Sequence, residues 1–405
     1  MPQFVYTAKT LQGETKSGSL EAKDIHQLAR ILRQDGSILI RAEISGQAQK
    51  RRGEINLSFF GPSLAEKMFF TRNLQVMISA GLPLPRALET LASQAKNTKF
   101  KKAILSIREE VLRGKSFSDS LIRFPDIFSS LFQNMVKVGE ESGTLEDVLK
   151  TLTVQLEREN DLKSKIKGAM IYPAVIISAM IGIGVIMLVT VVPKLNETFK
   201  ELNVQLPLTT RLVIDFADFL TQKWYWAVAI FILVIFLTRQ ILKSASGKRF
   251  FDRVFLRIPV LSSLVKNTNS AFTARTLSSL ISAGVSLPKS LEITSGTLGN
   301  IYYRKALMEA QEKVKTGEKL SAVFGNYSQI FPQTLIQMIS VGEETGETSG
   351  VLDKIASFYE EEVANVTKNM TSIIEPVLMI VIGAVVGFFA VSMVQPMYSM
   401  LGAVE

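Results

Sequence analysis

The stretch Ile78-Ser-Ala-Gly-Leu-Pro-Leu-Pro-Arg-Ala-Leu-Glu89 returns 203 positions later as Ile281-Ser-Ala-Gly-Val-Ser-Leu-Pro-Lys-Ser-Leu-Glu292. Between Arg72 and Glu89, ten of eighteen residues are identical at this shift. The same shift relates further glycine, acidic and proline residues: Gly114 and Gly317, Gly139 and Gly342, Glu140 and Glu343, Glu141 and Glu344, Pro173 and Pro376, Pro193 and Pro396. Because the offset never changes over this length, the chain contains one structural unit used twice.

The repeated stretch itself has the pattern of a corner between two helices. An apolar helical face precedes Gly81, and glycine is the residue that most often ends a helix in the left-handed conformation. Pro85 follows at a position where the first turn of a helix tolerates proline. Gly284 and Pro288 occupy the same positions in the second copy. We therefore predict a structural role for these four residues.

The composition indicates a membrane protein. Of the 405 residues, 47% are hydrophobic and only 20% are charged, which is richer in apolar residues than an ordinary soluble domain. The chain has no cysteine and a single histidine, His26, so thiolate chemistry and a histidine metal cluster are excluded. The net charge of +9 is explained by basic residues beside membrane helices, and we expect no nucleic-acid partner.

Three apolar stretches are candidate membrane spans: residues 169–192, 224–242 and 373–394. The first is free of charged residues and is expected to end at Pro193, whereas Pro173 near its start is tolerable. The second begins with Trp224, Tyr225 and Trp226, which suit a membrane interface.

The spans divide the chain into segments. We predict an all-α membrane protein with a small α/β head and two homologous cytoplasmic helical-bundle domains. The expected segments are a head at 1–44, a linker at 45–62, a first helical domain at 63–168, a polar outer loop at 193–223, a second helical domain at 243–372 and an outer tail at 395–405. In the head, Asp24 is expected to cap a helix that begins at Ile25.

The number of spans decides the topology. Two copies joined directly would place their soluble domains on opposite faces of the membrane, and the unpaired middle span returns the chain to the first face. Six basic residues and one acidic residue between Arg239 and Arg257 mark that face as cytoplasmic. The N-terminus is then expected inside and the C-terminus outside.

Two polar motifs are candidates for chemical sites. Gly114-Lys115-Ser116 resembles the end of a phosphate-binding loop, but position 109 is glutamate instead of glycine, so we predict no nucleotide site. The segments Gly139-Glu-Glu-Ser-Gly143 and Gly342-Glu-Glu-Thr-Gly346 are the strongest polar features. Their acids, Glu140, Glu141, Glu343 and Glu344, are either solvated residues of a helix corner or a surface that contacts a basic partner. Cation binding by these acids stays open, and the absence of a neighbouring nucleophile argues against catalysis.

These motifs together resemble the type II secretion F-protein family. The resemblance lies in the duplicated corner at Gly81 and Pro85, the duplicated Val-Gly-Glu-Glu motif and the span that opens with Tyr172-Pro173. It covers roughly 63–405, and the head is similar to the family's N-terminal segment. The second copy departs from it, because Glu375 precedes Pro376 there.

The resemblance implies a function without catalysis. Members of this family are inner-membrane platform proteins of type II secretion and type IV pilus machines. The implied partners are a cytoplasmic hexameric assembly ATPase, pilin or pseudopilin subunits, other inner-membrane components of the machine and further copies of the chain itself, without any cofactor. The competing hypothesis is a membrane scaffold or sensor unrelated to filaments, and the sequence does not separate a pilus from a secretion system.

Overall fold

The computed structural model describes residues 3–10, 15–44, 61–201 and 206–401, and the chain divides into two compact units, residues 1–60 and 61–405. The predicted linker therefore lies almost wholly outside the described residues.

The first unit is the α/β head. Strands β1 (Gln3–Thr10), β2 (Thr15–Glu21) and β3 (Ser37–Ile44) form an antiparallel sheet in the order β2-β1-β3, and helix α1 spans Ile25–Gln34. As predicted, Asp24 caps α1, and its carboxylate accepts a hydrogen bond of 2.7 Å from the Gln27 N–H. Leu28 and Leu32 of α1 are buried in the core of this unit.

The second unit contains the repeat, and its helices keep the 203-residue shift. The first helical domain comprises α2 (Leu64–Ser79), α3 (Leu84–Gln94), α4 (Thr98–Leu112), α5 (Phe117–Ile122) and α6 (Ser130–Ser142). The second comprises α11 (Ala245–Phe255), α12 (Pro259–Ser282), α13 (Leu287–Thr297), α14 (Ile301–Lys315), α15 (Leu320–Gly325) and α16 (Gln333–Thr345). Each of α3 to α6 begins and ends one full shift before its counterpart, so the two domains share one fold.

The corner that decides the fold is formed identically in both copies. Gly81 has a φ of 76° and Gly284 a φ of 85°, in the left-handed region that glycine adopts without steric cost. In each copy two backbone N–H groups beyond the helix donate to its last carbonyls, for example Leu82 N to Met77 O at 2.9 Å. The same turn follows α4 at Gly114, so the lysine and serine after it link two helices, as expected.

Each helical domain has its own hydrophobic core, and each core also receives residues from the other domain. The core of the first domain includes Phe70, Phe100 and Phe128, whose rings lie 5.3 to 6.1 Å apart. Ile293 of the second domain belongs to that same cluster, and Leu162 of the first domain belongs to the core of the second. Because apolar side chains interlock in both directions, we expect the two domains to move together.

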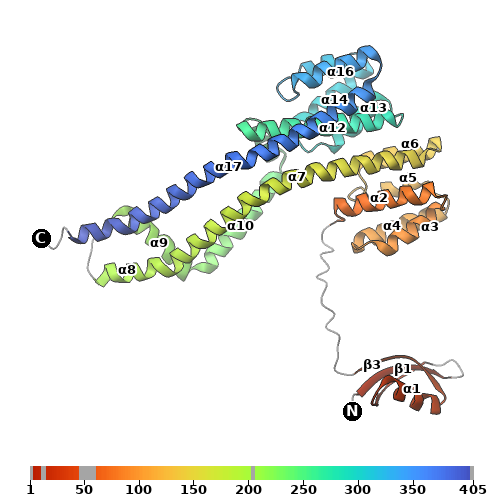
Figure 1. The fold of residues 1–405 in the computed structure, drawn as a ribbon, viewed down its shortest axis with the longest axis horizontal. Helices are drawn as coiled ribbons and strands as arrows, with labels where there is room; N and C mark the ends of the chain where they lie inside the picture. The colour runs from red at the N-terminus through yellow and green to blue at the C-terminus, as the bar shows by residue number, and fades with distance from the viewer. Residues whose placement is uncertain (1–2, 11–14, 45–60, 202–205, 402–405) are drawn as a thin grey trace. The chain divides into compact units, whose positions relative to one another are not determined.

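Two long helices carry the bundles into the apolar segments, as Figure 1 shows. Helix α7 spans Leu145–Ile186 and α17 spans Thr348–Leu401. At 1.5 Å per residue, these helices are about 63 and 81 Å long, twice the ~30 Å of a bilayer core or more. Together with α10 (Trp224–Lys243), they supply three helices that are long and apolar enough to span a membrane.

Proline does not end the first span, which corrects the expectation for Pro193. After α7, one π-helical turn (Met187–Val191) leads directly into α8 (Val192–Glu201), and Pro193 is the second residue of α8. Proline lacks an N–H and its ring crowds the carbonyl four residues earlier, and a wider π turn at this point accommodates both. Likewise Pro396 lies inside α17 instead of ending it.

Helices occupy most of the described residues of the segment 193–223, which are 193–201 and 206–223, and this corrects the expectation of a polar loop. Helix α9 (Leu208–Gln222) follows α8, and both contribute to a small apolar cluster with Val192, Ile214 and Ala217. Phe389 and Met393 of α17 pack against that cluster, and the Thr210 hydroxyl donates to the Ser392 carbonyl. The charged residues made this amphipathic pattern hard to recognise in the sequence. Its apolar face packs the segment against the end of α17.

Candidate functional site: acidic corners, interdomain cleft and membrane groove

The first acidic corner is built around the Glu140 carboxylate at the end of α6. It accepts hydrogen bonds from the N–H groups of Phe117 and Ser118 at 2.6 and 3.0 Å, and from the Ser118 hydroxyl at 2.7 Å. These N–H groups belong to the first turn of α5, where they have no partner within the helix and the helix dipole favours a negative charge. Glu140 therefore joins α6 to α5 inside the first domain.

The second copy repeats this arrangement and separates the two acids of each pair. Glu343 accepts from the N–H groups of Leu320 and Ser321 at 2.5 and 3.2 Å. By contrast, Glu141 is exposed and lies 3.8 Å from Lys137, and Glu344 is exposed and accepts from the Ser340 hydroxyl at 3.3 Å. The first glutamate of each pair thus holds the domain together, while the second is available at the surface.

The glycines of the motif have structural roles of their own. A Cβ on Gly139 would lie 2.9 Å from Val148 Cγ2 and 3.1 Å from the Cα of Leu145, so glycine permits α6 and α7 to approach closely. Gly342 faces Val351 in the same way. Gly143, with a φ of 73°, ends α6. Most of the motif is therefore structural, and we found no group of three or more His, Asp or Glu suited to a metal among the residues that the structure describes.

A buried ion pair lies where the two helical domains meet. Arg275 of α12 donates to both carboxylate oxygens of Glu360 on α17, at 2.8 and 3.0 Å, and also bonds Asp353 and the Ser357 hydroxyl. Arg158 of α7 approaches Glu360 at 3.9 Å. This network connects α12 to the long helices of both copies. Truncating one member would leave a buried charge unpaired, which is costly.

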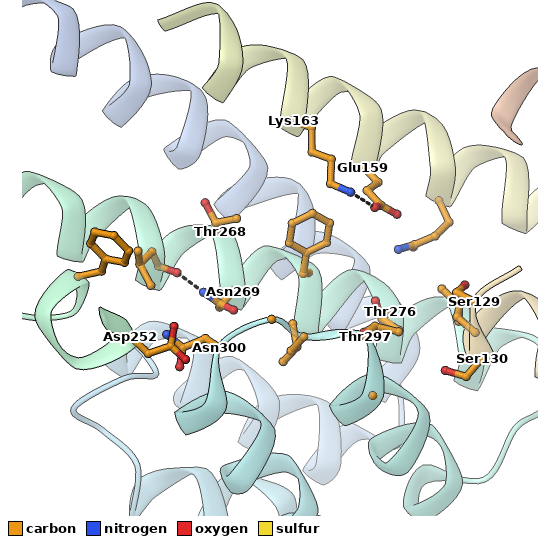
Figure 2. A pocket seen from close by; sticks show the side chains of 18 of the residues that line it. Ser129, Ser130, Glu159, Lys163, Asp252, Thr268, Asn269, Thr276, Thr297 and Asn300 are labelled. Atoms are coloured by element: carbon orange, nitrogen blue, oxygen red, sulfur yellow. Dashed lines mark hydrogen bonds and ion pairs between the residues drawn. The ribbon is translucent and has the colours of Figure 1, made fainter. Parts of the chain in front are cut away.

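A cleft of about 670 Å³ separates the facing surfaces of the two domains beside this network. Figure 2 shows Glu159 and Lys163 of α7 on one wall, joined by an ion pair, and Asn269 and Thr276 of α12 on the opposite wall. The lining combines apolar side chains with polar ones and with charged ones of both signs. Because α7 and α12 line the cleft, a change in its width would displace α7 and the span that continues from it.

A second groove lies between the apolar parts of α7 and α17. It has a volume of about 390 Å³ and is lined by apolar residues and one glycine: Ile176, Ala179, Met180, Ile183, Gly184, Met187, Ile382, Val385, Val386, Phe389 and Ala390. A Cβ on Gly182, Gly184, Gly383 or Gly387 would meet nothing within 4 Å, so close packing inside the chain does not explain these glycines. The groove can accept an apolar helix or acyl chain.

Sequence reasoning missed the network around Arg275 and the cleft. One signal was present: α12 carries a run of polar residues, including Thr273, Arg275, Thr276, Ser278 and Ser279, and all of them are buried. A helix with buried polar residues on several faces needs hydrogen-bonding neighbours on more than one side. The structure provides them for Arg275 and Ser278 on α17 and for Ser279 on α7, whereas the Thr273 hydroxyl has no partner among the described residues.

These features define a class: a multi-pass membrane protein with a duplicated helical domain whose last helix continues into a span. The family model for type II secretion system protein F matches residues 70–193 and again residues 273–396, and the model of that protein's N-terminal domain matches residues 1–43. The two matched ranges differ by the same 203 positions as the repeat. The chain belongs to the type II secretion system protein F family, which confirms the resemblance seen in the sequence.

Relatives from both kinds of machine align over nearly the whole chain. The type IV pilus assembly protein PilC of Thermus thermophilus is 34% identical and covers 100% of both chains. The PilC of Myxococcus xanthus is 33% identical over 100% of this chain and 96% of its own. The type II secretion system protein F of Vibrio cholerae is 27% identical over 99% and 98% of the two chains.

Proposed function

We propose that this chain is the inner-membrane platform of a type IV pilus or type II secretion machine, and that it couples a cytoplasmic hexameric assembly ATPase to the insertion or extraction of pilin-like subunits. Its relatives are named for type IV pilus assembly and for type II secretion. A role as a scaffold or sensor unrelated to filaments has no such support. We assign no catalytic step to the chain.

The continuity of α7 is the observation that carries the mechanism. Val148 and Leu152 of this helix belong to the core of the first domain, and Leu162 belongs to the core of the second. The same helix then enters the apolar segment and exposes Ile177 and Ile183 there. A force applied to either soluble domain therefore reaches the bilayer through one continuous helix, in which one backbone hydrogen bond is missing at Pro173.

The groove between α7 and α17 is the proposed contact for a pilin-like subunit. Such subunits are held in the membrane by an apolar helix, and the groove offers an apolar surface with space beside Gly184. Because the two domains are interlocked, bending of α7 in its apolar part, beyond the domains, would change the width of the groove. That change would let the platform bind and then release a subunit in step with the ATPase.

The same proposal includes the topology. The contact between the two helical domains requires that both lie on one side of the membrane, which is consistent with two spans between them. The excess of basic residues between Arg239 and Arg257 supports the cytoplasm as that side. The N-terminus is then cytoplasmic and the C-terminus lies outside.

The second glutamates of the acidic corners are the proposed contacts for the ATPase. Glu141 and Glu344 are exposed at equivalent positions of the two domains, and a basic surface on the partner would complement them. Glu140 and Glu343 are left out of this part of the proposal because they hold α5 and α15.

Photo-crosslinking in the native membrane tests the function. A photoreactive residue at Ile183, which lines the groove, should crosslink to a pilin-like subunit, whereas one at Phe231, which is exposed on α10, should not. Equal labelling at the two positions, or none at Ile183 in cells that assemble filaments, would contradict the proposed groove.

Charge reversal tests the ATPase contact separately. Glu141→Lys with Glu344→Lys should reduce recovery of the ATPase with the full-length chain, and should reduce filament assembly or secretion, while the chain stays folded. Lys137→Glu, one turn from Glu141, is the matched control for a charge change elsewhere on α6. Unchanged recovery and unchanged assembly would remove these acids from the interface.

A further inference from the structure

The contact between the two helical domains uses different faces of the repeated unit. The first domain contributes its α6 and α7 face, which we call the front face and which includes Gln155 and Leu162. The second domain contributes its α12 and α13 face, which we call the back face and which includes Ser279 and Ile293. Such a contact is heterologous, so it leaves one unused front face and one unused back face in each chain.

The unused front face lies on α16 and α17 of the second domain. Its central residue is Phe358, which occupies the position of Gln155 after the 203-residue shift. Gln155 is 3% exposed because the other domain covers it, whereas Phe358 is 49% exposed. A small hollow beside Phe358 is lined by Thr334 and Met338, so the aromatic ring stands on a shaped surface.

The unused back face lies on α2 of the first domain. Val76 occupies the position of Ser279, and it is 55% exposed where Ser279 is 8% exposed. Phe69, two turns earlier on the same helix, is also half exposed. Neighbouring apolar side chains that are exposed on a helix face are typical of an interaction surface.

In each of these two pairs of positions, the two members are matched in polarity. Inside the chain the pair is polar, since the Ser279 hydroxyl donates to Gln155 Oε1 at 3.1 Å. At the unused faces the corresponding pair is Phe358 and Val76, and both members are apolar. A change of one member without the other would have placed an apolar side chain against an unpaired polar one, which is costly.

The charges near these pairs differ in one sign, although an arginine is present at both contacts. Inside the chain, Arg158 of the front face reaches Glu360, which is held by Arg275. The corresponding front-face residue of the second domain is Glu361, which would meet Glu157, a residue of the same charge, together with Arg72, so Arg72 has to pair with both carboxylates. Arg72 lies 3.6 Å from Glu157 and its side chain is exposed, so it can also pair with an arriving carboxylate.

We infer that a second copy of this chain is the partner of these faces: the front face of its second domain, around Phe358, docks on the back face of the first domain, around Val76, in the relation that already joins the two domains within one chain. Copies in one membrane present both faces on the same side, because the two domains of each chain are in contact. The resulting assembly is head-to-tail, and it can extend to further copies or close into a ring.

Cysteine crosslinking of the full chain in its membrane tests this inference, since the chain has no cysteine of its own. Val76→Cys and Phe358→Cys variants are expressed together and oxidised. The expected product is a crosslinked dimer at about twice the 44.9 kDa of the chain. Neither variant alone should form it, because a heterologous contact never brings a face against itself. The double variant in one chain should give a ladder of larger products.

The matched control moves both cysteines by the repeat shift. The double variant Gln155→Cys with Ser279→Cys should form a disulfide within one chain and no dimer. The yield of that disulfide sets the oxidation conditions. Absence of the mixed dimer under those conditions would overturn the inference. A dimer from either single variant would overturn it too, since that result requires a symmetric contact. As a second measurement, Phe358→Glu should lower the apparent mass of the chain in native nanodiscs, and an unchanged multimer would count against the docking.

Discussion

The repeated unit carries the same arginine–glutamate pair twice, in two different environments. Arg72 of α2 lies 3.6 Å from Glu157 of α7, and its side chain is 67% exposed. Arg275 of α12 holds Glu360 of α17 by two hydrogen bonds, and its side chain is 8% exposed. The difference arises because α7 of the first domain covers α12 of the second, whereas the corresponding face of α2 is open.

Sequence identity between the copies therefore does not fix the energetic value of a residue. An exposed ion pair is screened by water and contributes about 0–1 kcal/mol to stability. Removing one member of a buried pair leaves an uncompensated charge and costs about 3–5 kcal/mol. The same two residues act as surface charge in one copy and as the link between domains in the other.

The largest expected effect comes from truncating the two arginines in parallel. Arg275→Ala should lower the free energy of unfolding by about 3–5 kcal/mol, because Glu360 stays buried with only Arg158 nearby. Arg72→Ala should lower it by at most about 1 kcal/mol. Denaturant unfolding of the detergent-solubilised full chain, followed by circular dichroism, measures both.

Arg275→Lys provides the control for charge alone. It keeps the positive charge and loses the bidentate hydrogen bonding to Glu360. The free energy of unfolding should therefore fall by an amount between those of the two alanine variants. Equal effects of Arg275→Ala and Arg72→Ala would show that burial does not distinguish the copies.

The next effect concerns the close contact between α6 and α7 and its counterpart. An alanine Cβ at Gly139 would lie 2.9 Å from Val148 Cγ2 and 3.1 Å from a backbone atom, whereas at Gly342 the closest approach is 3.2 Å. Gly139→Ala should therefore destabilise the chain by about 1–3 kcal/mol. Gly342→Ala should be close to neutral, since the gain of about 0.5–1 kcal/mol from replacing a helical glycine offsets a milder overlap.

Gly168→Ala is the matched control for that glycine effect. Gly168 lies in α7, and a Cβ added there would meet nothing within 4 Å, so the substitution should stabilise the helix. The same unfolding measurement compares the three variants. A larger loss of unfolding free energy for Gly342→Ala than for Gly139→Ala would contradict the difference in packing between the copies.

Much of the fold follows from local patterns that the sequence displays directly. The 203-residue shift, the glycine corners and the middle span at Trp224 were predicted, and the structure has all of them. The continuation of the helix past Pro193 was not predicted. A π-helical turn can accommodate a proline, and no local sequence pattern indicates such a turn. The helices after it were missed because their buried face is narrow and their remaining residues are charged.

The candidate site was predictable to a smaller extent, for a physical reason. Glu140 caps α5 from 23 residues away, and a single copy gives no hint of that contact. The repeat does give one, since Ser118 and Ser321 recur at the same shift as Glu140 and Glu343. The repeat gives no signal for the burial of Arg275, because that burial depends on a contact between the copies instead of one within each, and only the run of polar residues on α12 points to it.

The smallest expected effect concerns a position where the two copies carry opposite charges. Glu110 accepts hydrogen bonds from Lys115, at 2.9 Å, and from Arg123, and these two partners lower its pKa. Its counterpart in the second copy is Lys313, which pairs with Glu309 at 3.4 Å and Glu318 at 3.9 Å. A carboxylate with a lowered pKa stabilises the folded chain at neutral pH and loses that contribution as the pH falls below about 4.5 and through the lowered value.

Glu110→Gln should accordingly lower the melting temperature at pH 7, by less than Gly139→Ala does, and the gap between variant and native chain should narrow steadily below pH 4.5. Glu109→Gln, at an exposed neighbour with the same change of charge, is the matched control. Thermal unfolding by circular dichroism at about pH 7, 5 and 3.5 gives the comparison. A gap of constant size would mean that Glu110 keeps its charge no more readily in the folded chain than in the unfolded one, and that the pairing with Lys115 and Arg123 does not set the acid sensitivity of the first domain.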